Sequence, residues 1–365
     1  MQTTLSRRGF VQKTAMATLA ATQLPSLIAA ETPLSVALVG GAHIHTPGFI
    51  NLLKGRSDVN VKSVWDHDAK RAAARAQSLG GKTQVVSDVN KIWSDGEIKG
   101  VVICSETDRH RELVLAAAAA RKHLFVEKPL GFTARDSWMM AGAMEKAELL
   151  FTTGYFMRTD PKHLFLKDQI AKGLFGKITR ARGSNCHNGS LGGWFDTEWR
   201  WMADPKQAGV GGFGDLGTHK LDILMWLLGD VESVTGSVNV ITGRYGACDE
   251  SGEALLKFKS GVTATLAAGW VDIDDPVQLL ISGTEAHASI VGDKLYYKNA
   301  KVAGADGKTP FTALPPASRQ PLHQWLDAMG GKGSQPLVSP KEAAARVAVM
   351  EAIYKGARSR TWVKV

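Results

Sequence analysis

The stretch His123-Leu124-Phe125-Val126-Glu127-Lys128-Pro129-Leu130 predicts the fold of this 365-residue chain. Leu124 to Val126 is typical of a short buried strand, because Val and Phe favour strands. Pro129 ends the strand, since proline has no N–H to donate to a neighbour. Glu127 and Lys128 therefore lie where a strand ends and a turn begins. In an open α/β sheet this is the edge at which ligands bind, although a solvated ion pair in a turn would also explain the two residues.

The residues around this stretch alternate between apolar runs and helical runs. Helices are indicated by amphipathic or alanine-rich segments that end at glycine or precede the next strand. Strand, helix, strand, helix in this order predicts a doubly wound parallel sheet. The expected strands are 35–39, 59–65, 84–86, 100–104, 124–126 and 149–153, and the expected helices include 69–79, 88–93 and 134–147 and one that ends at Arg121.

A glycine-containing turn, Gly40-Gly41-Ala42-His43-Ile44-His45, follows the first strand. Thr46 is the expected N-cap and Pro47 the first helical residue, which makes the turn a site for a pyrophosphate. The G-x-G-x-x-G fingerprint is incomplete, because Ala42 stands at its second place and His45 at its third.

Asp66 closes the second expected strand, about 20 residues past the turn, where a carboxylate binds the adenosine ribose hydroxyls. An acid there repels a 2′-phosphate, so NAD is favoured over NADP. We expect Gly40, Ala42, His43, Ile44 and Asp66 to contact the cofactor. His43 and His45 could also bind a metal ion, but packing or donation to phosphate is the preferred interpretation, and no metal is predicted.

The second half of the chain alternates with period two in several segments. Such runs joined by turns predict an open, mostly antiparallel sheet. The expected strands are 177–184, 253–258, 262–268, 278–281, 288–291 and 294–297, and the expected helices are 161–172, 321–330 and 340–357.

A glycine-rich approach at 209–214 opens a further helix that ends at Gly229. Asp215, His219 and Asp222 are spaced i, i+4, i+7 and share one face of it. We expect Asp215 to hydrogen-bond His219, fix its tautomer and raise its basicity. A surface pair on an amphipathic helix is the simpler alternative.

Segment 190–205 carries Trp194, Trp199 and Trp201 without helical period. These rings could form an aromatic platform for a sugar, or they could simply pack in the core.

The N-terminus reads Ser6-Arg7-Arg8-Gly9-Phe10, then a weakly apolar run to Ile28 and Ala29-Ala30. This predicts a twin-arginine signal over residues 1–30 and a periplasmic or otherwise exported protein, with an ordinary secretory signal as the alternative. No other run is long enough to span a membrane, so we expect no insertion after cleavage.

The formal charge of +9 comes without a dense basic block, and nucleic acid is not an expected partner. Cys104, Cys186 and Cys248 are too few for a disulfide framework or a zinc site, and we expect them to pack as small buried residues.

Taken together, these motifs resemble the glucose–fructose oxidoreductase / inositol dehydrogenase (Gfo/Idh/MocA) family. The likeness spans about residues 34–365, and its points appear in family order. They are the turn at Gly40, Asp66, the segment 105–110, Glu127-Lys128-Pro129, Arg158, the segment 211–219 and the final helix.

The resemblance implies an NAD-binding Rossmann domain at 34–153 and an α/β domain at 154–365, whose open sheet often joins a homo-oligomer. The family's catalytic Lys, Asp and His correspond to Lys128, Asp215 and His219, with a cis bond before Pro129. The cofactor would also contact Ser105, Thr107, His110, Glu127 and Lys128. A carbohydrate substrate would lie near Tyr155, Arg158, His187, Trp194, Trp199, Trp201, Asp215 and His219. Ala42 and His45 depart from the family pattern, and so does Glu106, at a position where relatives usually carry proline. These departures leave the detailed contacts with the cofactor open.

In this interpretation His219, oriented by Asp215, is the general base and Lys128 stabilises the alkoxide. An exported enzyme has no external NAD supply, so we expect tightly bound, recycled NAD. Oxidation of one sugar could be coupled to reduction of another, or a glycoside could be hydrolysed by oxidation, elimination, hydration and reduction. The second scheme needs another base, for which Tyr155, His187 and Glu198 are candidates. A non-catalytic sugar- or nucleotide-binding protein is the alternative of another class, and the presence of all three catalytic residues argues against it.

Overall fold

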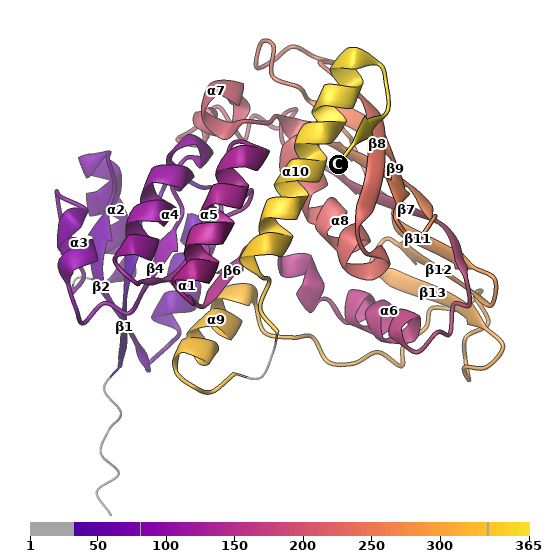
Figure 1. Ribbon diagram of the computed structural model, residues 1–365, viewed down its shortest axis with the longest axis horizontal. Helices are drawn as coiled ribbons and strands as arrows, with labels where there is room; N and C mark the ends of the chain where they lie inside the picture. The colour runs from indigo at the N-terminus through magenta and orange to yellow at the C-terminus, as the bar shows by residue number, and fades with distance from the viewer. Residues whose placement is uncertain (1–32, 81, 334–335) are drawn as a thin grey trace, which may run out of the picture. The chain divides into compact units, whose positions relative to one another are not determined.

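The computed structural model describes residues 33–80, 82–333 and 336–365, and these form two β-sheets with flanking helices (Figure 1). The expected signal segment 1–30 lies outside the described residues. No helix of the described part has the length and apolar character needed to cross a membrane.

The first sheet has six strands, all parallel, in the order β3-β2-β1-β4-β5-β6. This is the dinucleotide-binding strand order, in which ligands bind at the carboxyl edge. The predicted Rossmann architecture is therefore confirmed. Its elements are β1 (Leu34–Val39), α1 (Thr46–Lys54), β2 (Val59–Trp65), α2 (Ala69–Leu79), β3 (Gln84–Val85), α3 (Asn90–Ser94), β4 (Gly100–Ile103), α4 (His110–Ala119), β5 (His123–Val126), α5 (Ala134–Lys146) and β6 (Phe151–Thr153).

The second sheet has eight strands in the order β13-β12-β11-β7-β10-β9-β8-β14. Only β7 and β10 pair in parallel, and the other neighbours are antiparallel, which confirms the predicted sheet type. The strands are β7 (Ile178–Cys186), β8 (Val231–Asn239), β9 (Ser251–Phe258), β10 (Thr263–Gly269), β11 (Val277–Gly283), β12 (Ala286–Val291), β13 (Lys294–Asn299) and β14 (Val363–Lys364). The helices of this half are α6 (Pro161–Ala171), α7 (Pro205–Ala208), α8 (Gly212–Leu228), α9 (Pro321–Met329) and α10 (Pro340–Ser359).

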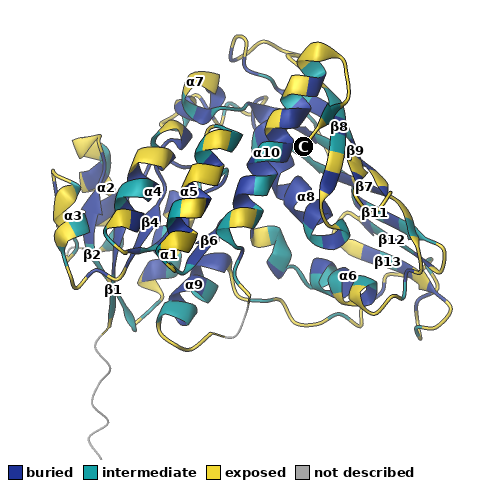
Figure 2. Ribbon diagram, viewed as in Figure 1, coloured by how far each residue is buried: buried dark blue, intermediate teal, exposed yellow. Residues whose placement is uncertain are grey.

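Helix α8 lies on the inner face of the second sheet and is buried along most of its length (Figure 2). It begins with glycine because a Cβ on Gly212 would lie 2.6 Å from the backbone oxygen of Glu250. This close approach holds the first turn of α8 against the sheet. Asp215 and His219 are carried into the interior on that turn and the next.

Helices α9 and α10 complete the core of the first sheet, although they come from the end of the chain. Leu322, Trp325 and Leu326 of α9 pack in one apolar cluster with residues of β1, β4 and β5. Trp325 also donates its indole N–H to the carbonyl of Leu150 at 3.2 Å. Ala343, Ala344 and Val347 of α10 join the other apolar cluster of this sheet. The polypeptide thus returns to the Rossmann half after building the second sheet.

Candidate active site

The turn between β1 and α1 has the backbone conformation that a nucleotide site requires. Gly40 has φ +77°, and a Cβ there would lie 2.7 Å from Ser105, so only glycine fits. The N-cap of α1 is His45 rather than the expected Thr46. The buried hydroxyl of Thr46 has no hydrogen-bond partner among the described residues.

Asp66 lies at the carboxyl end of β2, as predicted, but its carboxylate is already engaged. It accepts hydrogen bonds from the backbone N–H of Gly41 at 2.8 Å and of Asp68 at 2.9 Å. Arg71 binds both oxygens, at 2.7 and 2.8 Å, and also binds Glu106 at 2.8 Å. Two carboxylates around one guanidinium leave a net negative charge, which suits ribose hydroxyls and repels a 2′-phosphate. The residues present therefore fit NAD.

Trp201 and Arg75 hydrogen-bond to backbone carbonyl groups of the turn. Trp201 is buried and donates its indole N–H to the carbonyl of Ala42 at 3.1 Å. Arg75 donates to the carbonyl of Gly41 at 3.0 Å and pairs with Glu198 at 2.8 Å. Of the two interpretations of Trp201, packing describes its indole, which lies on the nucleotide turn. Glu198, a candidate second base, is instead the counterion of Arg75.

Lys128 and Asp215 form a buried ion pair at the carboxyl end of β5. The ammonium Nζ lies 2.7 Å from Oδ1 of Asp215, and Trp270 donates its indole N–H to Oδ2 at 3.1 Å. Burial alone would raise the pKa of Asp215, but the charge and hydrogen bond of Lys128 outweigh burial and hold that pKa well below its usual range. The peptide bond from Lys128 to Pro129 is cis, as the resemblance implies.

His219 lies one turn beyond Asp215, but the expected hydrogen bond between them is absent from the structure. Both oxygens of Asp215 face Lys128 and Trp270 instead. The buried Nδ1 of His219 has no partner in the described part of the chain. Burial holds the pKa of His219 well below 6.5, so the ring is neutral near pH 7 and can accept a proton. The prediction that Asp215 orients this histidine is therefore wrong.

Glu127 anchors a second polar group that the sequence did not reveal. Its Oε1 lies 3.0 Å from Nδ1 of His45, and its Oε2 accepts the backbone N–H of Lys128 at 2.6 Å. Nε2 of His43 lies 3.9 Å from Oε2. The donor atoms of these two histidines and Glu127 lie within 4.8 Å of one another, so they could hold a metal ion.

The contacts of this group are those of a hydrogen-bonded network rather than of a prepared metal site. Nδ1 of His43 accepts the backbone N–H of His45 at 3.2 Å, so the proton of its neutral ring is on Nε2, the atom that faces Glu127. Burial lowers the pKa of His43 to about 3. Both oxygens of Glu127 already have partners, and a metal would have to displace them.

Arg158 is engaged by acidic side chains of two helices. Its guanidinium binds both oxygens of Asp222, at 2.8 and 2.6 Å, and Glu342 at 2.9 Å. Asp222 also accepts from Arg346 at 2.9 Å. The predicted role of Arg158 in the substrate site is therefore wrong, because the side chain joins α8 to α10.

The other residues expected near the substrate differ in exposure. Tyr155 is buried, its hydroxyl lies 3.1 Å from that of Thr218, and burial raises its pKa above the usual value. The ring of His187 lies 4.8 Å from that of Trp194, which is 44% exposed, and these two rings remain a predicted carbohydrate surface. Trp199 packs against the core of the second half.

The remaining residues expected near the cofactor surround the turn. Ser105 and Thr107 are buried, and Ile44 packs against the core of the second half. His110 is also buried, but its ring nitrogens lie beside the carbonyl oxygens of Ser105, Pro129 and Leu130. It braces the turn after Lys128 and has no ring nitrogen left to bind the cofactor, contrary to the prediction.

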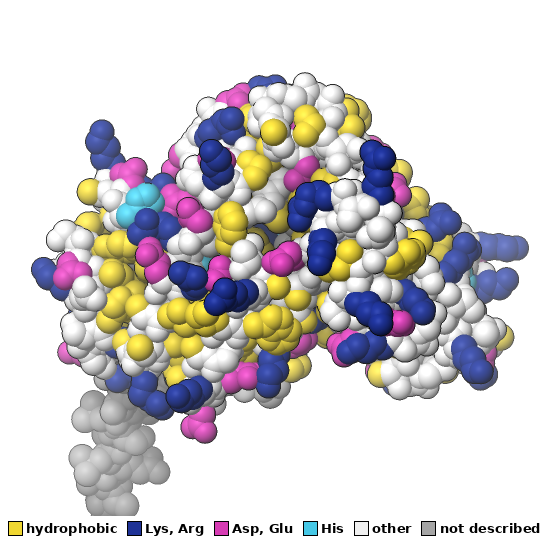
Figure 3. Space-filling view, turned by 45° about the horizontal axis from the view of Figure 1, so that its top comes forward, with side chains coloured by type: hydrophobic (Ala, Val, Ile, Leu, Met, Phe, Trp, Pro, Cys, Tyr) yellow, Lys and Arg dark blue, Asp and Glu magenta, His cyan; other side chains and the backbone are white. Residues whose placement is uncertain are grey.

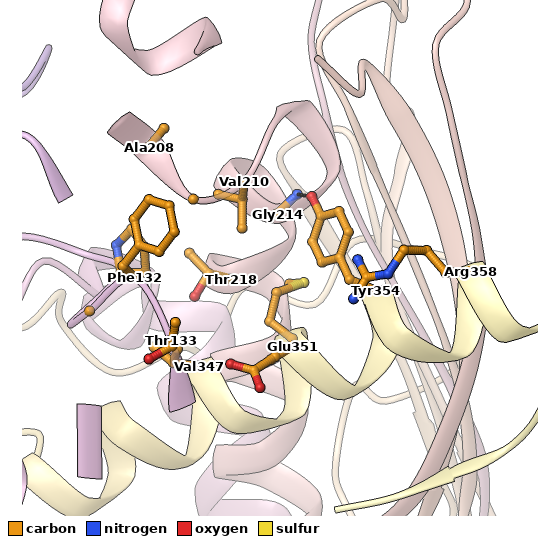
Figure 4. A pocket seen from close by; sticks show the side chains of 14 residues that line it. Phe132, Thr133, Ala208, Val210, Gly214, Thr218, Val347, Glu351, Tyr354 and Arg358 are labelled. Atoms are coloured by element: carbon orange, nitrogen blue, oxygen red, sulfur yellow. Dashed lines mark hydrogen bonds between the residues drawn. The ribbon is translucent and has the colours of Figure 1, made fainter. Parts of the chain in front are cut away.

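Pro129 lines two hollows. The smaller, of about 10 Å³, also touches His43, Lys128, Trp201 and Asp215. The larger, of about 290 Å³, lies between the loop that precedes α5 and the helices α8 and α10, and is lined by Phe132, Thr218, Tyr354 and Arg358 among others (Figure 4). It contains neither Lys128 nor His219, so its size does not make it the site of chemistry.

On the molecular face shown in Figure 3, Lys and Arg side chains are interspersed with acidic ones.

Cys104 and Cys248 are buried and Cys186 is partly buried, and all three are free thiols.

Two family models match the chain. The oxidoreductase family with an NAD-binding Rossmann fold covers residues 34–155, and the GFO/IDH/MocA C-terminal domain covers residues 163–289.

Three curated relatives carry the names of dehydrogenases or reductases. Levoglucosan dehydrogenase of Pseudarthrobacter phenanthrenivorans is 29% identical over 57% of this chain, and the match spans 52% of that protein. 1,5-Anhydro-D-fructose reductase of Ensifer adhaerens is 28% identical over 70% of this chain and 74% of its own length. Myo-inositol 2-dehydrogenase of Thermotoga maritima is 27% identical over 64% of this chain and 67% of its own.

Solved structures share the fold. Levoglucosan dehydrogenase in complex with NADH and levoglucosan superimposes with a TM-score of 0.75 at 22% identity, over 91% of this chain and 99% of that one. The two family models confirm the predicted resemblance: the chain belongs to the Gfo/Idh/MocA family of NAD-binding oxidoreductases.

Proposed function

We propose that this protein oxidises a ring CH–OH group of a sugar or glycoside with NAD that stays bound and is recycled. The observation that carries the proposal is the Lys128–Asp215 ion pair at the carboxyl edge of the Rossmann sheet, with the neutral ring of His219 one helical turn away. When bound, NAD supplies a reversible acceptor for the hydride of the ring carbon.

Side chains of the protein accept the hydroxyl proton and stabilise the charge on the substrate oxygen. His219 is the general base for the hydroxyl proton, because its ring is neutral and its Nδ1 is unpaired among the described residues. Lys128 stabilises the negative charge that develops on the substrate oxygen. Asp215 holds the ammonium in place, and Trp270 in turn fixes Asp215.

Recycling of the cofactor follows from the proposed export of the protein by its N-terminal twin-arginine segment. Outside the cytoplasm there is no expected supply of free NAD, so each reduced cofactor has to be reoxidised in place. The domains at 34–153 and 154–365 would serve nucleotide and substrate respectively, and the eight-stranded sheet is the proposed surface for a homo-oligomer.

A second candidate function is glycoside hydrolysis by oxidation, elimination, hydration and reduction. One relative of the chain carries a name that denotes addition of water: 2,7-anhydro-N-acetylneuraminate hydratase of Escherichia coli, 27% identical over 56% of this chain and 55% of its own length. Both candidates share the first hydride transfer. A non-catalytic binding protein is disfavoured, because it has no need of a buried Lys–Asp pair next to an unpaired histidine.

The test uses the purified full-length protein without added cofactor. Sugars and nitrophenyl glycosides are added in turn, and the near-ultraviolet absorbance of reduced nicotinamide is followed. We expect reduction of up to one cofactor per chain, reversed by a keto sugar. Aglycone release without added NAD would favour the hydrolytic scheme. If no nucleotide co-purifies and none binds, the redox proposal fails.

A further inference from the structure

His45 and Glu127 form a hydrogen-bonded pair beside the catalytic residues. Nδ1 of His45 lies 3.0 Å from Oε1 of Glu127, whose carboxylate is fully buried, whereas 34% of the His45 side chain is exposed. Glu127 is fixed on its other side by the backbone N–H of Lys128. We propose that His45, held by Glu127, is a second acid–base that moves the proton on the substrate carbon next to the oxidised carbon.

This pair has the features that a proton-transfer group requires. A carboxylate on Nδ1 sets the tautomer of an imidazole and leaves Nε2 free to accept a proton. Burial alone would raise the pKa of Glu127, but its interactions with the two histidines and with Lys128 outweigh burial and keep the pKa low. Glu127 is therefore an anion that accepts the hydrogen bond from Nδ1 of His45. Its role is positional, because the buried carboxylate acts through the ring.

The position of His45 relative to His219 supports the assignment. The two ring centroids are 6.2 Å apart, and the ring of Phe156 lies 4.9 Å from His219 and 6.4 Å from His45. A general base acts within about 3 Å of the proton that it removes. Two bases at this separation can therefore reach atoms on neighbouring carbons of one sugar ring.

The earlier candidates for a second base are less suitable. Tyr155 is buried, and burial raises its pKa. Glu198 is the counterion of Arg75. His187 stacks on Trp194, and its Nδ1 accepts the backbone N–H of Gly189 at 2.9 Å. Among these residues and His45, only His45 has a carboxylate partner together with close approach to His219.

The proposed step rests on the second candidate function, glycoside hydrolysis, and balances as follows. Oxidation of a glycoside at C3 forms a ketone that acidifies the C2–H bond. His45 takes the C2 proton, and the electron pair of that bond forms an enolate. The enolate re-forms the ketone and a C1=C2 double bond while the C1–O bond breaks, and the aglycone leaves as an oxyanion that receives a proton. Addition of water to C1=C2, with return of a proton to C2, gives the free keto sugar.

The experiment supplies the substrate already oxidised, so that hydride transfer is not needed. The holoenzyme is mixed with a nitrophenyl 3-keto-glycoside in heavy water, and nitrophenol release and deuterium at C2 are measured. A separate assay follows cofactor reduction by the unoxidised glycoside. We compare the wild type with His45→Gln, and with His287→Gln as a matched control on β12, where the ring contacts Ser282.

We expect the ratio of C2 exchange to cofactor reduction to fall about 100-fold in His45→Gln, the usual loss when a general base is removed, and to be unchanged in His287→Gln. His45→Ala should regain exchange when free imidazole is added, which a structural defect would not allow. Glu127→Gln should lower the turnover of exchange more than it changes the KM of the keto-glycoside.

Three results would overturn the assignment. One is exchange in His45→Gln at the wild-type ratio. Another is a wild-type enzyme that reduces its cofactor but exchanges no C2 proton, which leaves the proposed oxidation intact. The third is exchange that is lost on chelation and restored by Zn²⁺, which would make the histidine–glutamate group a metal site. Absence of any cofactor reduction, with exchange intact, would instead refute the proposed oxidation.

Discussion

Nζ of Lys128 lies 2.7 Å from Oδ1 of Asp215, whereas His219, on the same face of the same helix as Asp215, donates no hydrogen bond to that carboxylate. Asp215 therefore pairs with Lys128 and not with His219. This arrangement separates charge stabilisation from proton transfer, and the two can be removed independently.

Removal of the Lys128 ammonium should affect both chemistry and stability. We expect Lys128→Ala to slow hydride transfer by at least about 100-fold, the usual loss when one oxyanion donor is removed. It should also lower the free energy of unfolding by about 3 kcal/mol, because a buried carboxylate is left without its counterion. Rapid-mixing kinetics and urea unfolding measure the two effects. The double variant Lys128→Ala, Asp215→Asn should regain stability but not the rate of hydride transfer. Turnover of the single variant Lys128→Ala near the wild-type rate would contradict the assignment.

Substitution of Arg158 should reduce stability and leave the substrate constants unchanged. Arg158→Met leaves Asp222 with Arg346 alone and removes a guanidinium that is mostly buried. Loss of one partner from such a buried pair costs about 3 kcal/mol. Urea unfolding should show this loss, while the KM for the sugar remains within a factor of about 2, a few tenths of a kcal/mol. A large rise in KM with unchanged stability would restore the role in substrate binding that the sequence predicted.

Trp201 should control release of the cofactor. Its indole N–H is bonded to the nucleotide turn at Ala42, and one such hydrogen bond contributes about 1 kcal/mol. We expect Trp201→Ala to release NAD roughly fivefold faster, as measured by retention of nucleotide after gel filtration. Trp194→Ala, an exposed tryptophan of the same segment, is the control and should retain NAD as the wild type does.

Stability should fall as the pH is lowered from 7 towards 4. Burial lowers the pKa of His43 to about 3 and that of His163 to about 4, from 6.5 in the unfolded chain. Below pH 6.5 the unfolded chain therefore binds more protons than the folded one, and the free energy of unfolding rises with pH across this window. Each histidine contributes up to about 1.4 kcal/mol per pH unit. Urea unfolding at several pH values should show a shallower slope for His163→Gln, and an equal slope would contradict this account.

The sequence predicted the elements whose signals are local. The apolar runs of β1, β4 and β5, the turn at Gly40 and the position of Asp66 all follow from residue type and spacing. Strand β8 escaped prediction, although its side chains alternate partly between buried and exposed. The short strand β14 was not predicted either, because two residues are too few to show an alternating pattern.

The partners of charged side chains could not be predicted in this way. Asp215 pairs with Lys128, 87 residues earlier in the chain, and with Trp270, 55 residues later. These contacts replace the expected hydrogen bond with His219 at i+4. The hydrogen bond between His45 and Glu127 joins residues that are 82 positions apart in the chain. Likewise, Arg158 looked available for a substrate until α8 and α10 brought Asp222 and Glu342 to it. Helical spacing shows which residues share a face, but the tertiary structure decides what that face meets.

The return of α9 and α10 to the first sheet has a consequence for biosynthesis. Trp325 and Val347 fill apolar positions of a sheet whose strands were all synthesised before residue 154. The nascent nucleotide-binding half therefore leaves the ribosome with both faces of its sheet incompletely covered, and it cannot mature domain by domain from the N-terminus. Only a finished polypeptide closes that half, so a chain that terminates early should be recognised by chaperones and proteases before it can acquire a cofactor.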